Sequence, residues 1–522
     1  FQTDEIIQEP TSTISTQTAT ITDLGSFNWS GAYMMQETDT EGIIPFTVDA
    51  LMDARGNPAS GFTSTSDASQ VIFDRTKPVL NQVQANSWNT YNSSWAKSGD
   101  TGRIYTNSSE HLMSISATIN STATTLLQYQ PSEYDLNYSF TDADPEGPIS
   151  FEIVYSDSTG NLGDTVKATT NNSFIIFDKT VPSNFTVGDV TSTGGNVVAT
   201  FWNSTNTGLD VIVPIESDST LDSGRVQIWA KVGANVFEML GDSSFILSSE
   251  VGETKTLSIP GVSVRAITGF AENDTITIKA KVFDIPGNET DGAESVTRLL
   301  IDETPPALVS VSYESDFSDS SLATVGHIIS LSFETDVEIQ IPSASISTSS
   351  ASISDLGSNR WTAMYTMQEN DLEGIIPFQI DTLTDSRGNP VEGVSTTTDG
   401  TQVTFDKTNP TLNPVTILSN NIDAEWAKVG DTVMVNFTAD ELVSSQVVSI
   451  VDQSASIIDL GGQAYTAKYE MTNSDSEGEI VFNIIVTDRV ELENDPVVET
   501  TDGSLVIFDR TVPTLPTLDI ES

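Results

Sequence analysis

The chain has 522 residues, too many for one hydrophobic core, and at about 100–200 residues per domain it predicts three to five domains. Its 74 acidic and 21 basic residues give a net charge of −53, which excludes nucleic acid as a partner and disfavours anionic membranes. The lack of cysteine excludes disulfides and thiolate metal sites, and no run of about 20 apolar residues predicts membrane insertion.

A repeat of roughly 100 residues, a common domain size, organises the chain. Each copy closes with an apolar run and an aspartate, followed by a threonine and a proline at fixed offsets. These closing aspartates are Asp74, Asp178, Asp302, Asp406 and Asp509. The repeat predicts modules at residues 1–77, 78–181, 182–305, 306–409 and 410–512, with the start of a further module at 513–522. The third module is the longest and the most divergent.

The first module matches the fourth without a gap. Its segment Met35–Phe46 returns almost unchanged as Met367–Phe378, and Phe1 aligns with Phe333, which lies well inside its own module. We therefore expect the first module to lack its N-terminal part, and the sequence to be an internal piece of a longer protein.

Short strands fill the modules in chain order. Examples are Ile149–Tyr155, Thr432–Thr438 and Glu479–Val486, which are rich in β-branched and aromatic residues, alternate with a period of two, and are bounded by turn residues. No window has a sustained helical period. The pattern predicts an all-β chain of tandem Ig-like antiparallel β-sandwich modules. Short junctions stiffened by proline predict an extended string.

Three acidic motifs recur at fixed spacing: Asp-x-Glu-Gly, Asp-x-x-Gly-Asn and the closing aspartate. About ten strand residues at roughly 3.3 Å each separate the first two, so these lie at opposite poles of a sandwich. The last strand returns the closing aspartate to the first pole, which faces the next module. The carboxylates expected to converge are Asp39, Glu41 and Asp74 with Asp157; Asp144, Glu146 and Asp178 with Asp284; and Asp371, Glu373 and Asp406 with Asp488.

Such a group of carboxylates predicts a structural Ca²⁺ site, because Ca²⁺ takes about 6–8 oxygen ligands. The alternative is that these motifs only form turns, since aspartate and asparagine next to glycine are ordinary turn residues. The scattered charge likewise has two interpretations. It attracts cations to the surface, or it only keeps an extracellular protein soluble.

The segment Trp426–Thr432 reads Trp-Ala-Lys-Val-Gly-Asp-Thr and is echoed at Trp95–Thr101. With Asp-x-x-Gly-Asn and Phe-Asp-Lys/Arg-Thr-x-Pro, it resembles the Ig-like repeats of two groups of large surface proteins. These are the surface-layer (S-layer) proteins of ammonia-oxidising marine archaea and the adhesins of marine bacteria. The first resemblance implies a structural subunit that tiles with its own copies into a porous, acidic lattice around the cell. The second implies a Ca²⁺-stiffened stalk of a large extracellular adhesin.

Two features favour the archaeal resemblance. The modules have diverged in sequence and length, and the chain carries Asn-x-Ser/Thr sequons, the acceptors of covalent N-glycans, although a chain rich in serine and threonine gains some by chance. The sequon asparagines are Asn28, Asn92, Asn107, Asn120, Asn137, Asn171, Asn184, Asn203, Asn273, Asn288 and Asn436.

No arrangement of residues indicates catalysis. His111 and His327 occupy different repeat positions and accompany no nucleophile, zinc or phosphate-binding motif. Carboxylates that recur once per module are more naturally structural, so we expect the chain not to be an enzyme.

Overall fold

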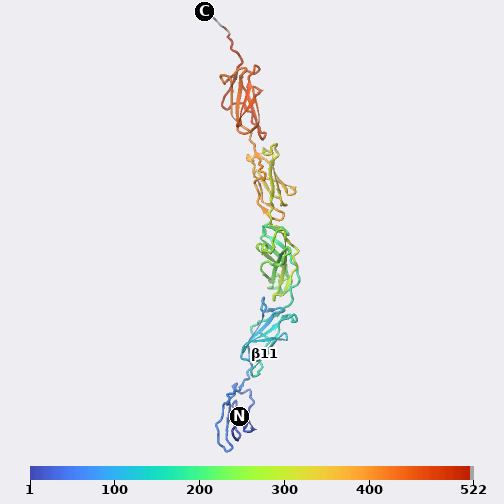
Figure 1. Ribbon diagram of the computed structural model, residues 1–522, viewed down its shortest axis with the longest axis vertical. Helices are drawn as coiled ribbons and strands as arrows, with labels where there is room; N and C mark the ends of the chain where they lie inside the picture. The colour runs from blue at the N-terminus through green and yellow to red at the C-terminus, as the bar shows by residue number, and fades with distance from the viewer. Residues whose placement is uncertain (516, 518–522) are drawn as a thin grey trace. The chain divides into compact units, whose positions relative to one another are not determined.

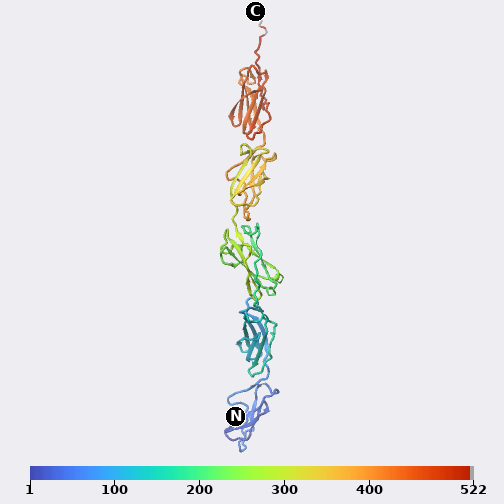
Figure 2. The same ribbon diagram turned by 90° about the vertical axis from the view of Figure 1, so that its right-hand side faces the viewer.

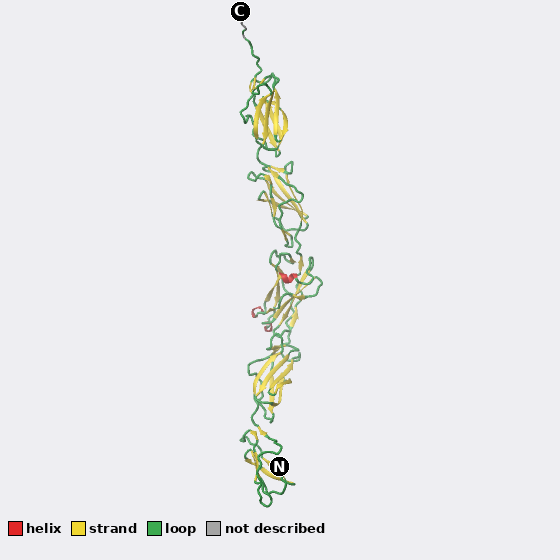
Figure 3. Cartoon of the chain, turned by 60° about the vertical axis from the view of Figure 1, so that its left-hand side comes forward, coloured by secondary structure: helices red, strands yellow, loops and turns green. Residues whose placement is uncertain are grey.

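The computed structural model describes residues 1–515 and 517, and Figures 1 and 2 follow the chain by colour from its N-terminus to its C-terminus. Strands dominate its regular structure (Figure 3), beside short 3-10 turns at Ser219–Leu221 and Ser248–Glu250 and the helix α1 at Gly261–Arg265. The prediction of an all-β chain built from antiparallel sheets is confirmed. The sequence pattern does not predict α1, because five residues are too few to show a helical period.

The chain divides into two compact units. One comprises Phe1–Thr191, Gly208–Phe270 and Asp274–Leu299, and the other comprises Ser192–Thr207, Ala271–Asn273 and Leu300–Ser522. The predicted module boundaries stay a prediction, and most of the segment 513–522 lies outside the described residues.

The first unit opens with three small antiparallel sheets. Here β1 (Thr11–Ile14) lies between β2 (Gln17–Thr18) and β6 (Phe46–Asp49), β3 (Thr20–Gly25) pairs with β4 (Asn28–Ala32), and β5 (Gly42–Ile43) pairs with β7 (Ile72–Phe73).

Residues 80–177 of the same unit form a sandwich. One sheet runs β13 (Thr125–Gln130), β14 (Glu133–Ser139), β10 (Thr101–Ser108), β8 (Leu80–Ser87), and the other runs β12 (Thr122–Ala123), β11 (Leu112–Ile119, labelled in Figure 1), β16 (Phe151–Asp157). A short third sheet runs β15 (Gly147–Pro148), β17 (Ile176–Phe177), β9 (Trp95–Ala96), and its β17–β9 pair is parallel. Both larger sheets contribute to one core, which includes the fully buried Ile104, Leu136 and Ile153.

The third predicted module has strands in both units. In the first unit, β20 (Gly208–Pro214) pairs with β24 (Thr254–Pro260), and β21 (Arg225–Val232) pairs with β22 (Glu238–Met239), β23 (Ser244–Phe245) and β25 (Thr275–Phe283). The strand β25 also pairs with β26 (Glu289–Asp291). In the second unit, β19 (Phe201–Trp202) runs parallel to the last two residues of β27 (Leu299–Ile301). The strand β18 spans Val190–Thr193.

The second unit contains two further sandwiches with the same sheet order as residues 80–177. In the first, one sheet runs β28 (Leu308–Ser315), β30 (Ile328–Thr335), β34 (Arg360–Thr366), β33 (Ser352–Gly357), and another runs β32 (Ser349–Ser350), β31 (Ala344–Ile346), β36 (Phe378–Ile380). Shorter sheets are β29 (Leu322–Ala323), β39 (Thr404–Phe405), β35 (Gly374–Ile375), and β37 (Leu383–Thr384) with β38 (Pro390–Val391).

In the second of these sandwiches, one sheet runs β40 (Leu412–Ser419), β42 (Thr432–Ala439), β46 (Ala464–Glu470), β45 (Ser456–Gly461). The others are β44 (Gln453–Ser454), β43 (Val443–Ile450), β48 (Phe482–Asp488) and β41 (Trp426–Ala427), β49 (Ile507–Phe508), β47 (Gly478–Glu479). Alternate residues of these strands are buried in separate cores, in which each buried aliphatic side chain contributes roughly 1.5–3 kcal/mol.

The prediction of one continuous strand at Glu479–Val486 is wrong. Gly478 and Glu479 pair with β49, whereas Phe482–Asp488 pairs with β43 in a different sheet. The chain changes sheets at this point, which places Asp488 at the far end of the second sheet. Among the described residues, no helix has the length and apolar character that a membrane span requires.

Candidate metal sites at the module junctions

Each closing aspartate directly follows a short strand. After β7, the Asp74 carboxylate accepts a hydrogen bond from the Thr76 N–H (3.0 Å). Glu41, from the Asp-x-Glu-Gly motif, accepts the Thr76 hydroxyl (2.8 Å), and this bond is the main cause of its lowered pKa. The same two bonds recur at Asp178 and Glu146 with Thr180, and at Asp406 and Glu373 with Thr408. Glu41, Glu146 and Glu373 therefore fix the threonine that follows each closing aspartate, where the chain leaves its repeat.

The aspartate of the Asp-x-Glu-Gly motif caps its own turn. Asp39 is 5% exposed, and its carboxylate accepts the Gln36 N–H (2.6 Å) and the Tyr33 hydroxyl (3.3 Å). Asp144 and Asp371 make the corresponding bonds with Thr141 and Tyr138, and with Gln368 and Tyr365. Among the described residues, the structure does not bring these three aspartates into a group of three carboxylates.

The Asp-x-x-Gly-Asn motif forms a tight turn around its own aspartate. One oxygen of Asp157 accepts the N–H groups of Thr159 (2.8 Å) and Asn161 (2.9 Å), and the other accepts the Asn161 side-chain amide (2.8 Å). Asp284 with Asn288 and Asp385 with Asn389 repeat this arrangement. The side-chain amide of the asparagine therefore closes the turn, and it is also free to bond a group outside the turn.

That amide reaches the closing aspartate of the preceding repeat. The Asn161 side chain donates to the Asp74 carbonyl (3.0 Å), and the Asn288 side chain donates to the Asp178 carbonyl (3.0 Å). Both contacts lie inside the first unit. They place the closing aspartate of one repeat beside the turn of the next, the adjacency that the motif spacing predicts.

Two groups of three carboxylates lie at such junctions among the described residues. Asp74, Glu110 and Asp157 form one, and Asp406, Glu441 and Asp488 form the other; each residue offers one carboxylate oxygen, and these oxygens lie within 4.8 Å of one another. The predicted partners Asp74 and Asp157 are thus together, as are Asp406 and Asp488. Binding of Ca²⁺ by these residues stays a prediction.

Sequence reasoning missed the third member of each group. Glu110 follows β10 and Glu441 follows β42, each in the loop that leads to the second sheet. Neither belongs to a recurring motif, because the equivalent loops of other repeats carry different residues. Alignment of the second repeat with the fifth is the one signal that singles them out.

The group at Asp488 contains an oxygen without a partner. Asp488 is fully buried, and its Oδ1 accepts the N–H groups of Val490 (2.8 Å) and Leu492 (2.9 Å). Its Oδ2 is buried and has no hydrogen-bond partner among the described residues. Burial, together with the nearby Asp406 charge, raises the pKa of Asp488. Burial and the charges of Asp406 and Asp488 raise the pKa of Glu441 to about 7.

A buried carboxylate without a compensating charge is unfavourable, and like charges in contact repel. An oxygen-only ligand set of this kind suits a hard cation such as Ca²⁺, with carbonyl oxygens and water completing the coordination. Asp406, Glu441 and Asp488 would hold it directly. In the Asp74 group, burial and the charges of Asp74, Asp157 and Glu41 raise the pKa of Glu110 in the same direction.

The junction at Asp178 differs. Asp178 and Asp284 are both buried, and no third carboxylate joins them in a group among the described residues. Burial, with the Asp178 charge, raises the pKa of Asp284 to about 7. The neighbouring segment packs directly here, because the Asn89 amide donates to the Pro286 carbonyl (2.7 Å).

The sequon asparagines differ in exposure. Asn92, Asn171, Asn184 and Asn273 are exposed, whereas Asn137 and Asn203 are buried, and Asn28, Asn107, Asn120, Asn288 and Asn436 are intermediate. The amide of Asn203 donates to the Asn196 and Arg387 carbonyls, and that of Asn288 donates to Asp178 and Asp284. Glycosylation stays a prediction, and it is best accommodated at the four exposed positions.

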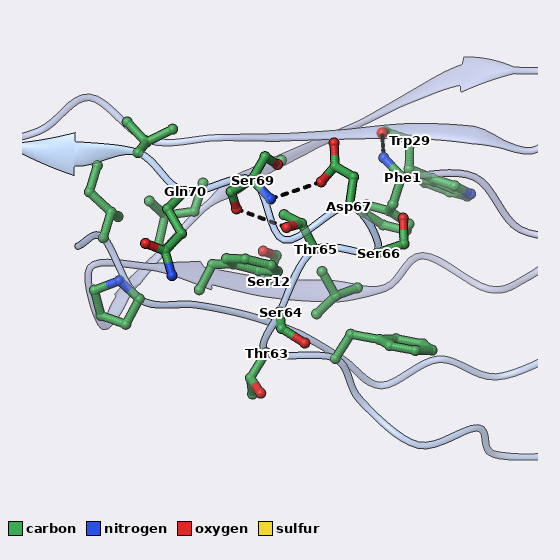
Figure 4. Close-up of a pocket in the computed structure, with 18 of the residues that line it drawn as sticks. Phe1, Ser12, Trp29, Thr63, Ser64, Thr65, Ser66, Asp67, Ser69 and Gln70 are labelled. Atoms are coloured by element: carbon green, nitrogen blue, oxygen red, sulfur yellow. Dashed lines mark hydrogen bonds between the residues drawn. The ribbon is translucent and has the colours of Figure 1, made fainter.

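A groove of about 1220 Å³ lies among residues 1–71 (Figure 4). Aromatic residues and a loop rich in serine and threonine line it. The loop is held by bonds from Ser69 N–H to Asp67 (3.0 Å) and from the Thr65 hydroxyl to the Ser69 carbonyl (2.8 Å). Nothing in this lining resembles the acidic groups.

No protein-family model and no curated protein matches the sequence. Among solved structures, a Ca²⁺-stabilised adhesin with which an Antarctic bacterium binds ice is similar at 12% identity and a TM-score of 0.36, covering 81% of this chain and 99% of that one. A 1.5-MDa bacterial ice-binding adhesin is similar at 13% identity and a TM-score of 0.28, covering 64% and 98%. The FN1–FN3 domains of chicken CNTN1 match at 12% identity and a TM-score of 0.22, covering 63% and 98%. With TM-scores this low, the likenesses determine neither ligand nor function.

Proposed function

We propose that the chain is a spacer segment of a large extracellular protein, and that Ca²⁺ fixes neighbouring β-sandwich modules at two of its junctions. The observation that carries the proposal is the Asp406–Glu441–Asp488 group. Asp406 closes the repeat 306–409, whereas Glu441 and Asp488 belong to the repeat 410–512. A cation bound by all three therefore ties one repeat to the next and removes their freedom to bend.

The charge of the chain supports this function. A net charge of −53 repels itself along the whole chain, so cations at the junctions offset the repulsion where the repeats meet. Extracellular Ca²⁺ modules typically bind with Kd values of about 10⁻⁴–10⁻³ M, so these sites would be occupied outside the cell and empty after chelation.

Isothermal titration of the full chain with CaCl₂ tests the proposal. We expect Glu441→Gln and Glu110→Gln each to weaken one binding event, by roughly tenfold or more. The matched control is Glu338→Gln, an exposed glutamate in the equivalent loop after β30 that belongs to no carboxylate group. Unchanged titrations for both test variants, or loss of binding in the control, would contradict the proposal.

Assembly into a glycosylated surface lattice is the second candidate function. It is favoured by the exposed sequon asparagines Asn92, Asn171, Asn184 and Asn273 and by the resemblance to S-layer repeats. In this case the partners are further copies of the chain, covalent N-glycans and cations at the cell surface. Electron microscopy with Ca²⁺ and after chelation distinguishes the two, since a lattice subunit forms ordered sheets whereas a spacer stays as separate particles.

A further inference from the structure

The junction that follows Asp302, inside the second unit, is closed by direct bonds. The Arg387 guanidinium lies 2.6 Å from Asp302 Oδ2, and the Asn389 amide lies 3.3 Å from Asp302 Oδ1. Asp302 is 6% exposed. Its carboxylate thus meets a positive charge and an amide donor, whereas Asp406 meets two further carboxylates.

Hydrogen bonds between asparagine side chains and the backbone reinforce this junction. The buried Asn203 donates to the Arg387 carbonyl (2.8 Å), Asn196 donates to the Gly388 carbonyl (3.0 Å), and Asn389 Oδ1 accepts the Ser204 N–H (2.8 Å). These bonds join the turn Asp385–Asn389 to residues 196–204 of the preceding repeat. They require no bridging ion.

Arg387 occupies the middle of the Asp-x-x-Gly-Asn turn. The same position is Thr159 at the Asp74 junction, where Glu110 adds a third carboxylate. The glycine that follows is also packed more closely at the Asp302 junction than at the Asp74 junction. A Cβ at Gly388 would lie 2.4 Å from the Asn203 amide, whereas a Cβ at Gly160 would meet no described atom within 4 Å. The Asp302 junction is tightly packed at this turn, and the Asp74 junction is open there.

We infer that Arg387 serves as a built-in cation at the Asp302 junction, so that this junction keeps its geometry without a divalent ion. The inference rests on the proposed function, in which Ca²⁺ supplies the positive charge at the Asp74 and Asp406 junctions. A guanidinium suits the task because it is charged at all accessible pH values and bonds carboxylates in a fixed geometry. The chain then combines cation-dependent junctions with one that chelation leaves intact.

Pairs of spin labels measure how far each junction bends in the full chain, which has no native cysteine to interfere with labelling. Ala271→Cys with Ser354→Cys spans the Asp302 junction, and Ser354→Cys with Ser454→Cys spans the Asp406 junction; all three sites are exposed. On adding EGTA, we expect the distance distribution across Asp302 to keep its width. The distribution across Asp406 is expected to broaden.

The variant Arg387→Ala is expected to broaden the distribution across Asp302 in Ca²⁺ and in EGTA. Arg360→Ala, an exposed arginine of the same repeat, is the control and leaves the width unchanged. Circular dichroism confirms that both variants are folded. Broadening across Asp302 in the unmodified chain on chelation, or no effect of Arg387→Ala, would overturn the inference. An unchanged width across Asp406 on chelation would instead refute the proposed Ca²⁺ function and leave the role of Arg387 standing.

Discussion

Glu441 lies two residues beyond β42, in a loop that brings it to Asp406 and Asp488. Replacing it by glutamine removes one ligand charge and relieves the repulsion among the three carboxylates. We expect Glu441→Gln to weaken Ca²⁺ binding by roughly tenfold or more, a loss seen even for groups that only support a ligand. We also expect it to stabilise the repeat 410–512 when Ca²⁺ is absent. Calorimetric titration and thermal unfolding in EGTA check the two effects, and a variant that binds Ca²⁺ normally would contradict the first.

The pKa of Glu441, raised to about 7, makes this repeat sensitive to pH. A carboxyl whose pKa is higher in the folded state stabilises the fold below its unfolded pKa, and this contribution is lost as pH rises through the folded pKa. Without Ca²⁺, protection of the amides of Val490 and Leu492 from hydrogen exchange is therefore expected to fall between about pH 5 and pH 8, after correction for intrinsic rates. Saturating Ca²⁺ replaces the proton and is expected to abolish the dependence. Equal pH dependence in Glu441→Gln would show that another group is responsible.

For single residues, the sequence predicts which carboxylates lie side by side better than it predicts which of them could bind a metal. The repeat spacing correctly pairs Asp74 with Asp157 and Asp406 with Asp488, because strand length fixes which ends of a sandwich meet. It cannot show that the Asp39 carboxylate accepts the Gln36 N–H, since an aspartate that caps a turn and one that binds a metal look the same in sequence. Glu110 and Glu441 were missed for a related reason: single loop residues carry no periodic signal.

The packing around the Asp-x-x-Gly-Asn turn distinguishes one junction from another. Gly388 has φ +99°, and a Cβ there would lie 2.4 Å from the Asn203 amide; Gly160 has φ +93° and open space around it. Gly160→Ala is expected to cost about 1–3 kcal/mol through backbone strain alone. Gly388→Ala adds a clash across the Asp302 junction and is expected to speed hydrogen exchange at the Ser204 N–H. Similar exchange at Ser204 in both variants would show that the turn does not dock as described.

The strands themselves were largely readable. Alternation correctly located β42, which begins at Thr432 as predicted and ends one residue later. It failed at Glu479–Val486, where the chain crosses from one sheet to another. Periodicity reports which side chains are buried. The alternation of buried Ile480, Phe482 and Ile484 with more exposed neighbours continues across the crossing, so the change of hydrogen-bond partner leaves no mark on the pattern.

At the scale of the whole molecule, repeats of similar sequence meet at junctions that differ in their contacts. Asp178 and Asp406 close their repeats in the same way, and each is followed by a lysine whose ammonium donates to carbonyls of the Asp-x-Glu-Gly loop. Beyond that lysine the two junctions diverge. At the first, Asn89 donates to the Pro286 carbonyl, whereas three carboxylates meet at the second.

Limited proteolysis with trypsin tests that difference with an internal control. Lys179 and Lys407 are equivalent cleavage sites, one residue beyond Asp178 and Asp406, so they differ mainly in the junction that protects them. We expect chelation of Ca²⁺ to accelerate cleavage after Lys407 strongly and cleavage after Lys179 much less. The reason is that exposure of a linker follows the opening of its junction, and only the Asp406 junction loses its bridging charge. Equal acceleration at both sites would instead indicate that Asp178 and Asp284 also hold a cation, as the motif spacing alone predicts. No acceleration at Lys407 would remove the support for Ca²⁺ at that junction.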